Sequence, residues 1–232
     1  MLPIKDDQPT YSTPLVNWFL IAINIVIFLF EATLSPRAEE ALAQTYGLVP
    51  QHLALFLAGS AGYRLAAVVV PFFTSMFLHA NWGHVLANMW FLYIFGDNVE
   101  DYLGHFKYLV FYTLCGLCAA MTQVVFSPHS TVPMVGASGA IAGVLGAYFI
   151  LYPRARVLTW FFVFIVYIPA WLVLGEWFVV QFFQGAVTLS MAQAGRDMGG
   201  VAVWAHVGGF IAGVVMIKIF PQRARRDPYA WR

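Results

Sequence analysis

The stretch MVGASGAIAGVLGAY, residues 134–148, puts a serine at the start of an apolar run and surrounds it with small residues. Gly136 precedes Ser138, and Gly139 and Gly143 follow it with the spacing of one helical turn. Small residues four apart let the backbones of two helices approach closely. The stretch therefore predicts a helix that carries a serine at its N-terminal end and packs tightly against a second helix.

The composition indicates a membrane protein. Of the 232 residues, 61% are hydrophobic and 10% are charged, against roughly 25% charged in an ordinary soluble domain. Aromatic residues make up 17% of the chain, which suits lipid-facing surfaces and interfacial belts. The net charge of +1 gives no basic balance that points to nucleic acid. We expect the protein to lie in the lipid bilayer and to bind no nucleic acid.

Six apolar segments approach the length that crosses a bilayer, about 20 residues. They predict an all-α membrane protein, a polytopic bundle of six transmembrane helices in a domain over residues 15–220. Residues 1–14 are expected to be a short cytoplasmic N-terminus and residues 221–232 a basic cytoplasmic tail. The predicted spans are Leu15–Leu34, Phe77–Phe95, Phe106–Phe126, Gly136–Tyr152, Val157–Phe178 and Val201–Phe220.

Two connections between the predicted spans are long. Residues 35–76 have too many Pro, Gly and polar breaks for a span but enough apolar groups to lie in the membrane interface. Residues 184–200, QGAVTLSMAQAGRDMGG, are small and polar, and they predict a flexible loop.

The flanking cations predict that both termini lie in the cytoplasm, since Lys and Arg concentrate on that side of a membrane. The opposite side then holds Arg37, Arg64 and Arg196. The cytoplasmic side holds the remaining nine cations, Lys5, Lys107, Arg154, Arg156, Lys218, Arg223, Arg225, Arg226 and Arg232.

Four polar residues fall inside the predicted second, fourth and sixth spans. They are His84, Asn88, Ser138 and His206. The three spans run in the same direction, and each of the four residues lies in the outer third of its span. Polar groups inside a membrane are expensive, and their shared depth indicates one functional site.

The spacing of these residues favours nucleophilic chemistry. Ala205, Gly209 and Gly213 give the sixth span a small-residue face, and if it meets the face of the fourth span, Ser138 and His206 come within hydrogen-bonding reach. A serine hydroxyl needs such an adjacent base to act as a nucleophile. The free N–H groups at a helix N-terminus suit a developing oxyanion.

Three motifs resemble the rhomboid family of intramembrane serine proteases. They are FLHANWGHVLANMWFLYIFGDNVE in the second span, GASGAIAG at the start of the fourth and AHVGGFIAG in the sixth, residues 77–100, 136–143 and 205–213. Their order and the topology match a bacterial-type, six-helix member over roughly residues 15–220. The resemblance implies an integral protein of a bacterial cytoplasmic membrane.

The resemblance also implies an activity and its residues. Ser138 corresponds to the nucleophile and His206 to the general base of a dyad without an acidic third member. Asn88 and His84 correspond to oxyanion-stabilising side chains. The implied substrates are transmembrane helices of other proteins, cut near their outer ends, with Trp177 and Phe178 at a lateral gate.

The chain departs from some relatives at Ala142, four residues after Ser138. Those relatives place an aromatic ring there that supports the catalytic imidazole, so His206 must be held here by other contacts.

Three alternatives compete with proteolysis. An α/β-hydrolase elbow reads G-x-S-x-G, but position 140 is Ala. A transporter also places polar groups at one depth, yet transporters usually have repeated halves and bind substrates near the midplane. An inactive relative that binds membrane helices would typically lack the serine or the histidine, and both are present.

The cysteines and the remaining histidines could in principle form a redox or metal site, but their surroundings and spacing argue against it. Cys115 and Cys118 lie in an apolar run, where a thiolate is costly, so we interpret them as packing residues. His79 and His84 are five apart, which is not the four-residue spacing of a helical metal site. We expect no metal and no cofactor.

Overall fold

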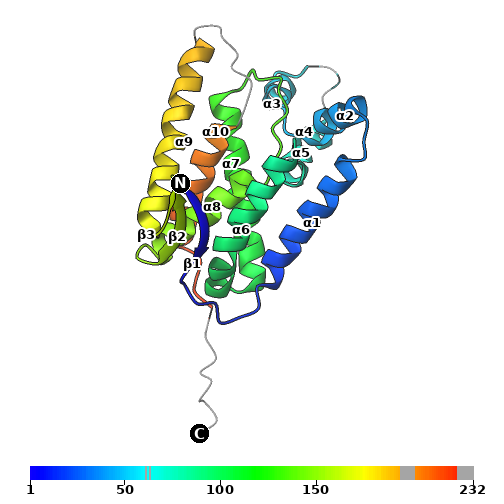
Figure 1. The fold of residues 1–232 in the computed structure, drawn as a ribbon. Coiled ribbons are helices and arrows are strands. Elements are labelled where there is room, and N and C mark those ends of the chain that lie inside the picture. Colours follow the sequence, from blue (N-terminus) through cyan, green and yellow to red (C-terminus); the bar gives the residue numbers. More distant parts are fainter. Residues whose placement is uncertain (61, 63, 194–201, 224–232) are drawn as a thin grey trace.

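The computed structural model describes residues 1–232 except 61, 63, 194–201 and 224–232. Its described part is mostly helical, and the longer helices lie side by side in one bundle (Figure 1). The elements in chain order are β1 (Leu2–Asp6), α1 (Leu15–Glu31), α2 (Pro36–Tyr46), α3 (Pro50–Leu57), α4 (Leu65–Val69), α5 (Pro71–Thr74), η1 (Ser75–Phe77), α6 (Trp82–Leu103), α7 (His105–Phe126), α8 (Ser138–Leu151), β2 (Arg156–Phe161), β3 (Phe164–Pro169), α9 (Ala170–Gln193) and α10 (Val203–Met216).

Helix α8 occupies the centre of the bundle. Every residue from Gly139 to Tyr148 is buried, and α6, α7, α9 and α10 all contact this helix. A helix that is apolar all round is suited to such a position. Its first residue, Ser138, is half-buried, so the hydroxyl remains accessible at the end of this buried helix.

The lengths of the helices support part of the predicted membrane topology. Within the described residues, two helices are long and apolar enough to cross a membrane, His105–Phe126 and Ala170–Met191. A third crossing results if Leu65–Phe77 and Trp82–Leu103, which meet at a bend of 77°, form one span. Helices α1, α8 and α10 are apolar but shorter, so the count of six spans stays a prediction.

The predicted fifth span, Val157–Phe178, is wrong over its first part. Strands β2 and β3 form an antiparallel hairpin there, with Arg156 opposite Pro169 and Phe161 opposite Phe164. Their residues are mainly β-branched or aromatic, and such residues favour strands. An apolar run without clear periodicity does not distinguish a strand from a buried helix, which explains the error.

Helix α9 begins at Ala170, directly after the hairpin, and continues to Gln193. The flexible loop predicted over residues 184–200 is therefore helical in its first part. The rest of that loop, including Arg196, lies outside the described residues. The shift of α9 along the sequence moves Trp177 and Phe178 from the predicted outer end of the span to the second and third turns of the helix.

The N-terminal segment adds a strand to the hairpin, and its cytoplasmic location stays a prediction. Strand β1 pairs antiparallel with β2, from Leu2 opposite Trp160 to Asp6 opposite Val157. In the described part of the chain this makes a three-stranded sheet of order β1-β2-β3, beside the lower part of α9 in Figure 1. The predicted all-α class is thus corrected to a mostly helical fold with a small sheet.

The first long connection, residues 35–76, contains the short helices α2 to α5, which gather at one end of the bundle (Figure 1). Leu48 and Phe72 from this connection form a buried apolar cluster with Ala120 and Val124 of α7. This packing fixes the connection on the bundle. Its location in the membrane interface stays a prediction.

The described start of the C-terminal tail lies at the opposite end of the bundle, where α6 ends and α7 begins. The Arg223 backbone N–H donates to the Tyr102 carbonyl at 2.8 Å, and the Lys107 ammonium donates to the Pro221 carbonyl at 3.1 Å. The other predicted tail cations, Arg225, Arg226 and Arg232, lie outside the described residues.

Candidate active site

Ser138 is positioned by a tight backbone path before α8. The Gly136 N–H donates to the Ser75 carbonyl at 2.8 Å, and Gly136 has a φ of +124°, a conformation that glycine adopts far more readily than other residues. A Cβ at Gly136 would also lie 2.6 Å from a ring carbon of His84. Glycine therefore lets the chain pass between η1 and His84 and enter α8 at Ser138.

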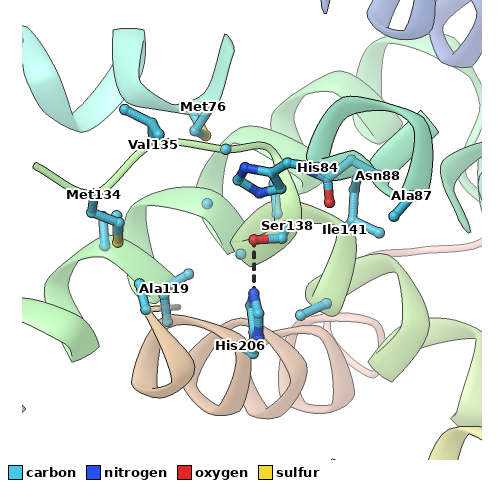
Figure 2. Close-up of a pocket in the computed structure, with 18 of the residues that line it drawn as sticks. Met76, His84, Ala87, Asn88, Ala119, Met134, Val135, Ser138, Ile141 and His206 are labelled. Atoms are coloured by element: carbon cyan, nitrogen blue, oxygen red, sulfur yellow. Dashed lines mark hydrogen bonds between the residues drawn. The ribbon is translucent and has the colours of Figure 1, made fainter. Parts of the chain in front are cut away.

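His206 on α10 faces this serine. Its Nε2 atom lies 2.7 Å from Ser138 Oγ, and Figure 2 shows the two side chains pointing toward each other across the cavity. The His206 side chain is buried in the described structure, with the residue 8% exposed. The residues come from two helices and lie 68 positions apart in the sequence.

Close backbone contact between α8 and α10 brings these two side chains together. A Cβ at Gly209 would lie 2.0 Å from the Gly139 carbonyl oxygen, and a Cβ at Gly213 would lie 1.9 Å from that of Gly143. Real side chains cannot tolerate such distances. The glycine spacing therefore permits the helix approach that brings Ser138 to His206.

His84 and Asn88 lie one turn apart on α6 and line the same cavity. Figure 2 shows them on the other side of Ser138 from His206. Asn88 is only 7% exposed, and its Nδ2 atom finds no hydrogen-bond partner among the described residues. A buried donor without a partner costs free energy, and it is available to an acceptor that enters the cavity.

The N-terminus of α8 offers further donors to the cavity. No side chain caps this helix end, and the first N–H groups of a helix have no acceptor within the helix. The dipole of the helix also makes this end favourable for negative charge. Asn88, His84 and the backbone at Ser138 thus converge on a region that suits an anion.

The cavity has a volume of about 660 Å³ and is mainly apolar. Its polar side chains include the four residues singled out from the sequence, and Trp177 of α9 also lines it. This volume falls in the usual range for sites that hold small ligands or peptide segments. The cavity can accommodate a few residues of an extended chain beside Ser138.

Trp177 and Phe178 both face α10. The ring of Trp177 lies 5.7 Å from that of His206, and the ring of Phe178 stacks on Phe210 at 4.7 Å. Ala142, which replaces the aromatic residue of some relatives, is fully buried. The imidazole is thus contacted by a ring from α9, although α8 offers none at that position.

Sequence reasoning missed a second contact of His206. Gln181 Oε1 lies 2.6 Å from His206 Nδ1, so both ring nitrogens have partners. The signal was a single amide in the apolar run WFVVQFF, residues 177–183. The predicted fifth span ended at Phe178, and this boundary left Gln181 outside it.

His79 was also missed as a neighbour of the site. Its ring packs edge-on against that of His84 at 5.1 Å, and its backbone N–H donates to the Glu31 carboxylate at 3.1 Å. Both ring nitrogens of His79 are buried without a hydrogen-bond partner in the described structure. His79 therefore packs behind His84 and supports the position of that ring.

The cysteines lie apart from this polar cluster. Cys115 is buried and Cys118 is half-buried, and both are free thiols. A Cβ at Gly143 would lie 2.4 Å from Cys115 Cβ, so this cysteine packs closely on α8. Within the described residues, no three His, Cys, Asp or Glu side chains gather to hold a metal ion.

The comparisons with known proteins agree on one family. The sequence profile of the Rhomboid domain matches residues 66–223. Rhomboid-like protein 11, chloroplastic, of Arabidopsis thaliana is 32% identical over 151 residues, which are 63% of this chain and 50% of that protein. Rhomboid protein 1, mitochondrial, of Saccharomyces cerevisiae is 29% identical over 167 residues, 68% of this chain and 45% of that protein.

A bacterial relative is among the matches. Rhomboid protease GluP of Bacillus subtilis is 30% identical over 144 residues, 62% of this chain and 25% of that protein. The chain spans half or less of the length of these three relatives. The profile match covers more than half of the chain, and the chain belongs to the rhomboid family. Its apolar helices are those of an integral membrane protein.

Proposed function

We propose that this protein is an intramembrane serine endopeptidase that uses Ser138 and His206 as a catalytic pair. The observation that carries the proposal is the 2.7 Å distance between Ser138 Oγ and His206 Nε2. A nucleophile hydrogen-bonded to a general base is the arrangement that activates a serine hydroxyl. Membership of the rhomboid family and the printed name of the Bacillus protease support the same activity.

The reaction proceeds in two stages. His206 Nε2 takes the Ser138 proton while Oγ attacks the scissile carbonyl, and it then protonates the leaving amine. The acyl group remains on Ser138 until a water molecule, activated by the same imidazole, releases it as a carboxylic acid and restores the hydroxyl. Each stage passes through a tetrahedral oxyanion.

Stabilisation of the oxyanion is assigned to Asn88, His84 and the backbone N–H of Ser138. The unpaired Nδ2 donor of Asn88 supports this role, as does the location of His84 on the same wall of the cavity. Donors that are already fixed around the developing charge require little reorganisation during the reaction.

The substrates we propose are transmembrane helices of other membrane proteins. A helix hides its carbonyls in internal hydrogen bonds, so the segment that reaches Ser138 must unwind. Substrates with small or helix-breaking residues near their outer ends meet this requirement. Trp177 and Phe178 of α9 are proposed as gate residues because they lie at the contact between α9 and α10.

The proposed location is a bacterial cytoplasmic membrane, with both termini in the cytoplasm and six crossings. The contacts of Lys107 and Arg223 at the end of the bundle opposite α2 to α5 support this orientation, since cations favour the cytoplasmic side. The relatives include a bacterial protein besides chloroplastic and mitochondrial ones.

The test is incubation of the purified full chain in detergent with a panel of transmembrane peptides. Wild-type protein should cleave some of them, whereas Ser138→Ala and His206→Ala should cleave none while they remain folded. Ser190→Ala is a matched control, because this exposed serine bonds to its own helix at the Ala186 carbonyl. Cleavage by Ser138→Ala at the wild-type rate would remove the proteolytic role of Ser138.

A further inference from the structure

We propose that Gln181 is a positioning residue for the catalytic base. Ser138, His206 and Gln181 would then form a hydrogen-bonded triad in which Gln181 orients the imidazole. This inference rests on the proposed function. The amide oxygen of Gln181 would hold His206 in the one neutral tautomer that is able to accept the serine proton.

The geometry on the two sides of the imidazole carries the inference. Gln181 Oε1 lies 2.6 Å from Nδ1, and Ser138 Oγ lies 2.7 Å from Nε2. A carbonyl oxygen only accepts hydrogen bonds, so Nδ1 must carry the proton and donate it. Nε2 then presents a lone pair to the serine hydroxyl, as a general base requires.

The location of Gln181 explains how His206 is held although Ala142 offers it no ring. Trp177 and Gln181 are four residues apart on α9, so they project from the same face of that helix. The centroid of the Trp177 ring lies 5.7 Å from that of the imidazole. The Gln181 amide oxygen contacts Nδ1 of the same imidazole. Helix α9 therefore supplies an apolar and a polar contact to the same side chain.

A neutral amide is chemically suited to this site. In papain-like proteases a Cys-His-Asn arrangement performs the same task, with an amide oxygen orienting the histidine. When His206 becomes an imidazolium, the Gln181 carbonyl dipole faces the new charge. An amide also avoids the large cost of burying a carboxylate in the membrane interior before the reaction begins.

The first experiment replaces the acceptor while it keeps the size of the side chain. Gln181→Met removes the acceptor, Gln181→Glu retains an acceptor oxygen, and Gln184→Met is the matched control, since Gln184 is an exposed residue of the same helix. The values of kcat and KM on a cleaved transmembrane peptide and the rate of Ser138 labelling by a fluorophosphonate are measured.

We expect Gln181→Met to lower kcat and the labelling rate by about 10- to 100-fold, part of the full contribution of a general base, with KM changed by less than about 2-fold because substrate binding is intact. Gln181→Glu should restore most of both rates, and Gln184→Met should match the wild type. Wild-type rates in Gln181→Met would overturn the proposal, and so would equal losses in the Met and Glu variants, or a change in KM alone.

A second measurement needs no variant at position 181. ¹⁵N NMR of histidine-labelled protein in detergent, with the His206 signals assigned by difference from His206→Ala, should show a protonated Nδ1 and an unprotonated Nε2. The opposite tautomer would overturn the proposal. Peptide cleavage by Ser138→Ala would instead refute the proposed function itself, so the two failures are distinguishable.

Discussion

Gly209 of α10 lies directly against the carbonyl oxygen of Gly139 on α8, where a Cβ would come within 2.0 Å of that oxygen. Gly139 directly follows Ser138 on α8, and Gly209 lies three residues after His206 on α10. Because both residues of the pair occupy rigid helices, the distance between their side chains depends on how closely the helices approach. The glycines therefore act on the site through backbone packing.

Substitution of Gly209 by Val should separate the helices and reduce the reactivity of Ser138. A displacement of about 1 Å at a catalytic site costs on the order of 100-fold in rate, and we expect a loss of this size in fluorophosphonate labelling. Gly175→Ala is the control, because a Cβ there would meet only Phe149 at 3.8 Å, an ordinary contact. Equal labelling of both variants would show that the pair does not depend on this packing.

Asn88→Ala should slow peptide cleavage although the nucleophile Ser138 is still present. Loss of one oxyanion donor costs about 3 kcal/mol in the barrier, or roughly 100-fold in kcat. Removal of the unpaired amide should also leave thermal stability unchanged or slightly higher, since its donor has no partner in the described structure. Unchanged kcat would assign Asn88 to packing.

Asp6 should make the stability of the fold depend on pH. Burial raises the pKa of its carboxyl from 3.8 to about 6, although a hydrogen bond from Tyr148 opposes this shift. The folded state thus binds the Asp6 proton more tightly than the unfolded state, so the contribution of Asp6 to stability is fully present below about pH 4 and is lost as pH rises to about 6. Because burial also raises the pKa of the Asp97 carboxyl, thermal unfolding in detergent should show a slope that is shallower in Asp6→Asn than in wild-type protein, but not absent.

The neighbouring Asp7 provides the control for this pH series. Hydrogen bonds from Arg156 lower the pKa of the Asp7 carboxyl below 3.8, so its contribution to stability is present above that value and is lost only as pH falls further. Asp7→Asn should therefore keep the wild-type slope between about pH 4 and pH 6. A shallower slope in Asp7→Asn, or an unchanged wild-type slope in Asp6→Asn, would contradict the assignment.

Glu100→Ala should destabilise the protein at the start of α1. The buried carboxylate accepts the N–H of Val16 at 3.0 Å and that of Asn17 at 2.7 Å, and hydrogen bonds to a charged group contribute about 1.5–3 kcal/mol each. We expect a loss of at least about 2 kcal/mol in unfolding free energy. Glu40→Ala, at an exposed position of α2, should change it by less than about 0.5 kcal/mol; a similar loss in both would contradict the capping role.

Much of the candidate site could be predicted from the sequence, because its signals are local. Glycines four apart indicate close helix contact, and isolated polar residues such as Ser138 and His206 stand out against an apolar background. The direction of successive spans then puts these residues at one depth. None of these steps requires knowledge of long-range pairing.

The sheet and Gln181 could not be predicted in the same way. The run from Val157 to Pro169 is as apolar as a membrane helix. Its two strands pair with each other in a hairpin, and β2 also pairs with β1, which lies about 150 residues away in the sequence. Once that run was assigned to a helix, the helix boundary at Phe178 left Gln181 outside the predicted span. The contact between Gln181 and His206 was therefore not predicted, because part of the run had been assigned to the wrong type of element.

The most direct test of the central claim is mass spectrometry of the protein after treatment with a fluorophosphonate. We predict one covalent adduct, on Ser138, formed by the wild type and reduced at least about 100-fold in His206→Ala, since the two residues act as a unit. Undiminished labelling of Ser138 in His206→Ala would contradict it, because another group would then activate the serine.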